Sequence, residues 1–113
     1  MASKNDILPG TLEMLVLQVL SDGPRHGYSI VRELAQLSEA VLRVEEGSLY
    51  PALHRMERRG LLAAEWGASE ANRRAKYYRV TARGRKELES KRAAWARMSG
   101  AVEKVLRSRP QEA

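Results

Sequence analysis

The 113-residue chain can form one small domain and one appended element, and its 43% apolar content is typical of a folded protein. Lys and Arg number 20 against 14 Asp and Glu, which gives a net charge of +6. This charge favours a polyanionic partner such as nucleic acid or an anionic membrane. Charge alone does not exclude the alternative that the cationic surface is only solvated. The absence of cysteine excludes disulfides, thiolate zinc sites and cysteine nucleophiles, and with two histidines we expect neither a metal nor a cofactor.

The first predicted helix covers about residues 11–22. Its apolar side chains recur with the i, i+3, i+4, i+7 spacing of a buried stripe, at Leu12, Leu15, Val16, Val19 and Leu20. Met14 and Leu17 are apolar but lie off this stripe, so we expect the helix to contact both its own domain and a second subunit. The apolar run contains Glu13 and Gln18 and is too short to cross a bilayer, and the N-terminal residues lack a leader pattern. We therefore expect a cytoplasmic protein that does not bind a membrane.

A second helix is expected over about residues 27–38, followed by a connector over residues 39–46. One face of the helix is predicted to enter the core through Tyr28, Val31, Leu34 and Ala35, flanked by Ile30 and Leu37. The connector is predicted to be held by Val41, Leu42 and Val44. His26, directly before the helix, is expected to be a turn or cap residue.

The stretch GSLYPALHRMERRG, residues 47–60, predicts a third helix with two different faces. The core-facing stripe repeats at i, i+4, i+7 at Leu49, Leu53 and Met56. The opposite face carries Pro51, His54, Arg55 and Arg58. Ser48 is predicted to cap the helix, which places Pro51 in the first turn, where its missing N–H breaks no hydrogen bond.

After Gly60 the pattern changes to that of a β-hairpin. Residues 61–66 and the segment RRAKYYRVT, residues 73–81, predict two strands joined by a turn over residues 67–72. Tyr77 and Tyr78 point to opposite faces, so one is expected in the core and the other on the surface. The predicted fold is mainly α with a small β-hairpin, a winged helix-turn-helix domain over residues 8–80.

The last predicted helix covers residues 82–107, on the order of 39 Å long, with Thr81 as its N-cap. One narrow apolar stripe repeats with heptad spacing at Leu88, Trp95, Met98, Val102 and Val105. A long helix with a single apolar stripe needs a partner to bury it, so residues 81–107 are predicted to be a dimerisation helix. The ends, residues 1–7 and 108–113, are expected to be flexible.

Three segments occur in the order and spacing of one known family: HGYSIVREL (residues 26–34), GSLYPALHRMERRGLL (47–62) and KYYRVTARGRKEL (76–88). Over about residues 8–107 the chain resembles the PadR family of bacterial transcription regulators, and its single helix after the hairpin resembles the smaller subgroup, whose members are homodimers. The resemblance implies a winged-helix repressor that binds a near-palindromic operator and often releases it when a small molecule binds. Ala75 and Asn72 depart from the pattern, since relatives often carry another basic residue and a glycine there, so we expect the hairpin tip to hold DNA differently.

Double-stranded DNA is therefore the expected partner, bound by the third helix and the hairpin. Phosphate and base contacts need cations and hydrogen-bond donors at fixed positions. The candidates are Ser48, Tyr50, Pro51, His54 and Arg55 on the helix and Arg73, Arg74 and Lys76 on the hairpin. Packing of Tyr50 on the domain is an open alternative. Arg58 and Arg59 are expected to be solvated charges at a helix C-terminus.

Trp95 has two open interpretations. It can be a packing residue of the dimer interface, or two copies near the dimer axis can sandwich a small flat aromatic effector, with Met14 and Met98 as an adaptable lining. One residue can serve in both roles.

A protein-interaction module and an enzyme are the two alternatives to a DNA-binding regulator. A winged helix can bind proteins without binding an operator, and the cationic face of the third helix argues against this alternative. An enzyme is not expected, because the sequence offers no nucleophile–base pair, no paired carboxylates and no phosphate-binding glycine loop. Gly84 in TARGRK is a lone glycine and carries no such signal.

Overall fold

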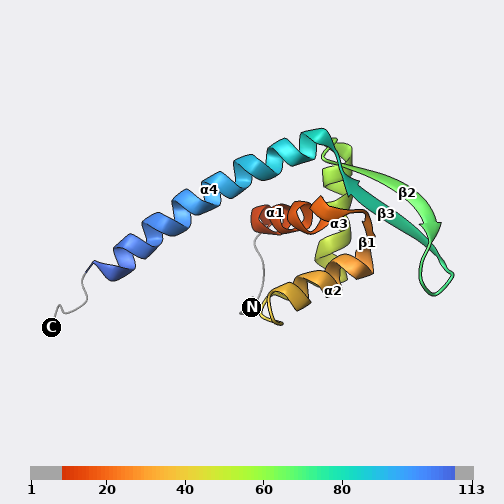
Figure 1. Cartoon of the computed structure of the whole chain (residues 1–113), viewed down its shortest axis with the longest axis horizontal. Helices are drawn as coiled ribbons and strands as arrows, with labels where there is room; N and C mark the ends of the chain where they lie inside the picture. Colours follow the sequence, from red (N-terminus) through yellow and green to blue (C-terminus); the bar gives the residue numbers. More distant parts are fainter. Residues whose placement is uncertain (1–8, 109–113) are drawn as a thin grey trace.

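The computed structural model describes residues 9–108 and confirms the predicted fold class, a winged helix followed by a long helix. Three helices pack together, a hairpin extends from one side, and the last helix runs away on the other (Figure 1), giving extents of 61 × 29 × 25 Å. The predicted flexible ends, residues 1–7 and 108–113, lie outside the described residues except for Ser108. In chain order the elements are α1 (Pro9–Val19), the 3₁₀ helix η1 (Leu20–Asp22), β1 (Arg25–His26), α2 (Gly27–Leu37), α3 (Glu46–Arg58), β2 (Leu62–Ala68), β3 (Arg74–Val80) and α4 (Ala82–Arg107).

The core lies between α1, α2, α3 and the sheet. Its fully buried apolar side chains come from every one of these elements and include Val16, Leu17, Ile30, Leu49, Leu53, Met56 and Tyr78. Leu17, which lies off the predicted stripe of α1, is thus buried inside its own chain, whereas Met14 is only half-buried. Of the two apolar faces of α1, the one with Leu17 therefore needs no second subunit.

The prediction of which side chains of α2 enter the core is partly wrong. Tyr28 is 54% exposed, because the helix turns Gly27, Ile30 and Leu34 towards the core instead. The ring of Tyr28 lies outside, with the guanidinium of Arg32 at 5.2 Å from its centroid. In the connector Val44 is buried as predicted, but Val41 is exposed. The N-cap prediction for His26 is confirmed, since its Nδ1 accepts a hydrogen bond from the Ser29 N–H at 3.2 Å.

Helix α3 begins earlier than expected, so the cap prediction for Ser48 is wrong. Glu45 is the N-cap, and its carbonyl accepts from the N–H groups of both Ser48 and Leu49 at 3.0 Å. Ser48 is consequently the third helical residue and Pro51 the sixth. Pro51 therefore lies beyond the first turn, on the exposed side of the helix. Because proline has no N–H, the carbonyl four residues earlier has no helical donor, and on this exposed side it can bond to water instead.

The hairpin of β2 and β3, called the wing from here on, pairs from Leu62↔Val80 to Ala68↔Arg74. A third strand, β1, pairs with β3 on its other side and was not predicted, because two residues carry no periodic signal. Tyr78 is the buried member of the tyrosine pair, and Tyr77 is partly exposed with its hydroxyl donating to the Ala68 carbonyl at 2.9 Å.

Helix α4 is joined to the domain by a compact junction, and its predicted bounds and cap are confirmed. The Thr81 hydroxyl accepts from the Gly84 N–H at 3.0 Å, while the Thr81 N–H donates to the Leu61 carbonyl at 3.1 Å. Gly84 is buried against this carbonyl, so closely that a Cβ would overlap the Leu61 oxygen and lie 2.7 Å from Val80 Cγ2. The glycine of TARGRK is thus what lets α4 approach the strands.

We expect Gly84→Ala to lower the free energy of unfolding by about 1–3 kcal/mol, the usual effect of forcing a methyl group into a filled site. The Leu61 carbonyl cannot retreat without losing its bond to Thr81. Urea unfolding followed by circular dichroism measures the change. Gly100→Ala is the matched control in the same helix, since a Cβ there meets no heavy atom within 4 Å, and it should be neutral or stabilising. Unchanged stability of Gly84→Ala would contradict the close approach.

Candidate nucleic-acid interface

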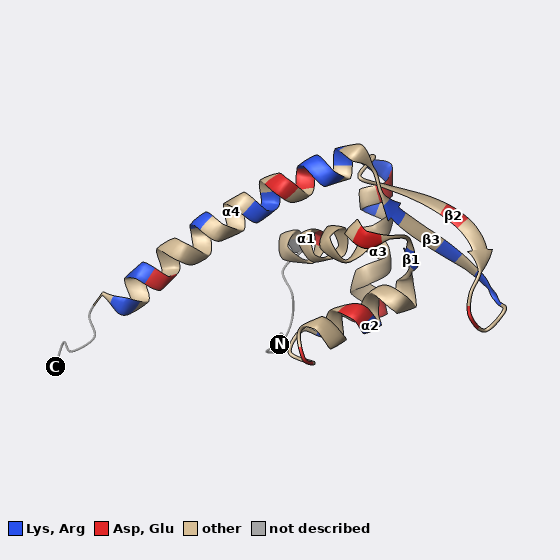
Figure 2. Ribbon diagram, viewed as in Figure 1, with Lys and Arg blue, Asp and Glu red and all other residues tan. Residues whose placement is uncertain are grey.

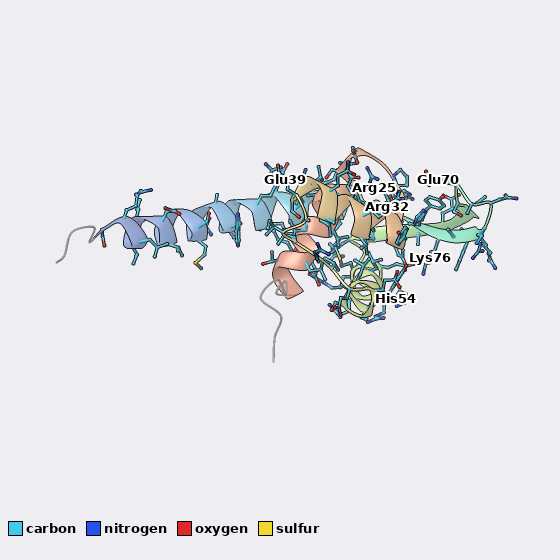
Figure 3. All side chains as sticks on the ribbon, turned by 90° about the horizontal axis from the view of Figure 1, so that it is seen from below. Arg25, Arg32, Glu39, His54, Glu70 and Lys76 are labelled. Atoms are coloured by element: carbon cyan, nitrogen blue, oxygen red, sulfur yellow. The ribbon has the colours of Figure 1, made fainter. Side chains whose placement is uncertain are left out.

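Helix α3 presents one face to the core and the other to the outside. Leu49, Leu53 and Met56 are fully buried and fix the rotation of the helix. The outer face is exposed at Ser48, Pro51, His54, Arg55 and Arg58. In Figure 3 His54 lies on the outer side of α3, pointing away from the body of the domain. The predicted helix residues other than Tyr50 are thus accessible to a large partner.

Tyr50 differs from its neighbours because its ring packs at the contact between α2 and α3. A Cβ at Gly27 would lie 2.5 Å from the Tyr50 hydroxyl oxygen, so the tyrosine closes directly over the first residue of α2. Burial, and next the nearby Glu46 carboxylate, raise the pKa of Tyr50 above its ordinary value. The geometry gives Tyr50 the packing role that the sequence left open, although the residue is still partly exposed.

The three predicted cations of the wing have different surroundings. Arg73 is exposed at the loop between the strands, and the guanidinium of Arg74 lies 4.4 Å from the ring centroid of Trp66. Lys76 Nζ lies 3.2 Å from Glu57 Oε1 of α3, and this hydrogen bond raises the pKa of Lys76. Figure 2 shows the basic segments along the wing, and Figure 3 places Lys76 between the wing and α3. One of the three charges is therefore already paired within the chain.

A hollow of ≈ 750 Å³ lies between α2, α3 and the wing. It brings together five of the predicted DNA-binding residues: Tyr50, His54, Arg73, Arg74 and Lys76. Ser48, Pro51 and Arg55 are not part of its lining and lie on the outer face of α3. The hollow also contains Tyr28, Arg32 and Trp66, which were not predicted to lie at the interface. Tyr28 was missed because its face of α2 was expected in the core, and Arg32, one turn later on the helix, was missed with it.

Helix α4 carries an uncovered apolar stripe beyond its contact with the domain. The predicted dimerisation residues Trp95, Met98, Val102 and Val105 are all exposed, and Leu106 extends the stripe. The prediction for Leu88 is wrong, since this side chain is 7% exposed and belongs to the core of its own chain. Leu88 shares the heptad spacing of the exposed stripe because both lie on one side of α4. This side packs against the domain at Leu88 and is exposed from Trp95 onwards.

A second hollow, of ≈ 370 Å³, lies between α1 and α4. It contains the three residues proposed from the sequence to hold an effector, Met14, Trp95 and Met98, together with Gly10, Thr11, Lys91 and Ala94. One cationic side chain, that of Lys91, thus lies at the border of this mostly apolar hollow. Within residues 9–108, no helix is long and apolar enough to cross a membrane.

Comparison with known proteins agrees with this architecture. The model of the Transcriptional regulator PadR-like family matches residues 16–90. Transcriptional regulator Rv3488 of Mycobacterium tuberculosis is 37% identical over 79 residues, 70% of each protein. The crystal structure of a PadR family transcriptional regulator from Eggerthella lenta is 39% identical with a TM-score of 0.75, over 87% of this chain and 83% of that one.

A PadR-like transcriptional regulator from Bacillus cereus is 32% identical with a TM-score of 0.74, over 87% of this chain and 93% of its own. The family match covers the hollow beside the wing, the outer face of α3 and the junction with α4. The members of this family regulate transcription by binding DNA and are not enzymes. The chain belongs to the PadR-like family of transcriptional regulators.

Proposed function

We propose that the protein is a cytoplasmic homodimeric repressor that binds a near-palindromic operator and releases it when a small flat aromatic compound binds. The observation that carries the proposal is the exposed, cationic outer face of α3 beside a basic wing, on a chain whose α4 leaves an apolar stripe uncovered. The first feature supports DNA recognition and the second supports pairing of two such recognition surfaces.

In the proposed complex α3 enters the major groove, which is about 12 Å wide and admits one helix. His54 and Arg55 then reach base edges, while Ser48 and the apolar ring of Pro51 contact the backbone and a thymine methyl. Arg73 and Arg74 follow the sugar-phosphate backbone or a narrow minor groove, where the negative potential is strongest. The larger hollow accommodates a strand of the duplex between α3 and the wing.

The exposed stripe of α4 supports the dimer. Trp95, Met98 and Val102 project apolar surface from one side of a helix that is otherwise polar, and such a stripe is buried most economically against its own copy around a two-fold axis. Two copies of α3 then meet two half-sites about 34–36 Å apart on one side of the duplex.

The smaller hollow supports the effector part of the proposal. An indole and two thioethers form an apolar, polarisable surface that suits a planar aromatic ring. Near a two-fold axis this surface is doubled, so that Trp95 serves both as an interface residue and as a platform for the effector.

The function is tested by selecting duplexes from a random pool with the purified protein. We expect a near-palindromic sequence whose binding weakens steeply with salt, because bound cations release counterions from DNA. Arg55→Ala should relax the preference at one position per half-site, with a loss of about 1–3 kcal/mol of discrimination. Arg107→Ala, which removes the same charge at the far end of α4, should leave the preference unchanged. If no sequence is enriched and affinity is independent of salt, the protein-interaction alternative is favoured instead.

A second prediction concerns the pairing of Lys76 with Glu57. Glu57→Gln removes a negative charge from the interface and releases the ammonium group for a phosphate, so binding to duplex DNA should tighten several-fold and the slope of log K against log salt should steepen by about one unit. A fluorescence anisotropy titration at several salt concentrations measures both. Glu103→Gln, a carboxylate change on α4 next to Arg107, is the control. Weaker binding by Glu57→Gln would show that the pair instead holds the wing in position.

A third prediction concerns Trp95. A planar dye such as acridine orange should quench the tryptophan fluorescence of the wild type and of Trp66→Phe, but not that of Trp95→Ala, because Trp66 lies in the other hollow. Sedimentation of Trp95→Ala establishes whether the variant is still a dimer. Quenching that persists in Trp95→Ala and disappears in Trp66→Phe would place the dye beside the wing and contradict the proposed effector site.

A further inference from the structure

Four charged side chains meet where α1, the end of α3 and α4 come together. Arg59 Nη1 lies 3.0 Å from Glu13 Oε1 and its Nη2 lies 3.7 Å from Glu87 Oε2. Lys91 Nζ lies 3.8 Å from Glu13 Oε1 and 3.7 Å from Glu87 Oε2. We call these four residues the ion cluster. The expectation that Arg59 is a solvated charge is therefore wrong.

The ion cluster differs from a surface ion pair because its central carboxylate is buried. Glu13 is 8% exposed, between the buried residues Leu12, Val16 and Leu17 of α1. A carboxylate in such a place is strongly destabilising unless cations and donors stay close to it. Arg59, whose side chain is half exposed, donates to Glu13 at hydrogen-bond distance and is consequently held in one position. Within residues 9–108 the neighbouring Arg58 makes no ion pair, although it has the same charge and lies at the same helix end.

The ion cluster lies between the helix with the exposed cationic face and the helix with the exposed apolar stripe. Arg59 is the C-cap residue of α3, the helix with the exposed cationic face. Glu87 and Lys91 are on the first half of α4, whose second half carries the exposed apolar stripe. A single guanidinium thus ties the end of α3, the proposed recognition helix, to the helix proposed to form the dimer, directly through Glu87 and indirectly through Glu13 of α1.

In a dimer the separation of the two recognition helices depends on the angle between α3 and α4. We propose that the ion cluster fixes this angle and thereby sets the half-site spacing that the dimer accepts, with Glu13 and Arg59 as positioning residues that do not touch DNA. This inference rests on the proposed dimeric operator binding. Lys91 also borders the hollow of Trp95, so the proposed effector site shares a side chain with the cluster.

The absence of cysteine allows a direct test of the angle. His54→Cys introduces one exposed spin-label site per chain on α3, and pulsed electron paramagnetic resonance measures the distance between the two labels of a dimer. We expect a narrow distribution for the labelled parent and for the added control Arg58→Gln. When Glu13→Gln or Arg59→Gln is added to the labelled parent, the distance distribution should shift or broaden by several ångströms. Arg59→Lys, which keeps the charge, should restore most of the narrow component.

Equal distributions in all of these variants would overturn the inference while leaving the dimer intact. A parent protein without any dipolar signal would overturn the dimer itself, and the spacing role with it. Circular dichroism and thermal unfolding establish that each variant is folded. If Glu13→Gln unfolds because its buried site is disturbed, the distance distribution of Arg59→Gln decides the inference, since this change affects a half-exposed side chain.

The second readout is specificity for spacing, which a merely destabilised protein would not change. With unlabelled protein, the duplex selected by the wild type is lengthened or shortened by one base pair between its half-sites. Wild type and Arg58→Gln should lose on the order of tenfold in affinity, the scale of one mismatched position. Arg59→Gln should lose much less affinity than the wild type when the spacing is changed by one base pair. An identical loss in Arg58→Gln and Arg59→Gln would overturn the inference.

Discussion

The burial of one face of α3 is the constraint on which the rest of the site depends. Leu49, Leu53 and Met56 are fully buried, and with 3.6 residues per turn their burial leaves the helix no freedom to rotate. His54 and Arg55 then have to face outwards, whatever their own preferences. The recognition surface is thus a consequence of the core. A change in the packing of α3 would alter every exposed position of the helix together.

The sequence predicts those features that a local period or a local bond decides. The core stripe of α3, the cap at Thr81 and the bounds of α4 each depend on neighbours within a few residues along the chain. Glu13, Arg59 and Leu88 could not be placed in this way, because their surroundings are formed by elements distant in sequence. The spacing of Leu88 is equally compatible with a core and with a dimer interface. Similarly, the rotation of α2 that leaves Tyr28 exposed brings Gly27 against Tyr50 of α3, a contact between helices that the sequence of α2 does not reveal.

Net charge is a poor measure of what this interface offers to DNA. Lys76 is paired with Glu57, and the guanidinium of Arg74 lies over Trp66, so two of the three predicted cations of the wing have an intramolecular partner that a phosphate must replace or accommodate. The hydrogen bond to Glu57 raises the pKa of Lys76, and binding a phosphate would cost that bond. These partners also hold the side chains in defined positions, which reduces the conformational entropy lost on binding. The charges of Arg74 and Lys76 are consequently less available to a phosphate than the composition of the wing indicates.

Helix α4 changes its environment along its length, and the change occurs next to the ion cluster. Its first turns belong to the domain, through the close approach of Gly84 and the burial of Leu88. From Trp95 onwards its apolar side chains are uncovered. Lys91 stands between the two parts, in contact with Glu13 on one side and with the hollow of Trp95 on the other. A displacement of the exposed part of α4 by a second subunit or a bound compound would therefore act close to the charged side chains that hold the end of α3.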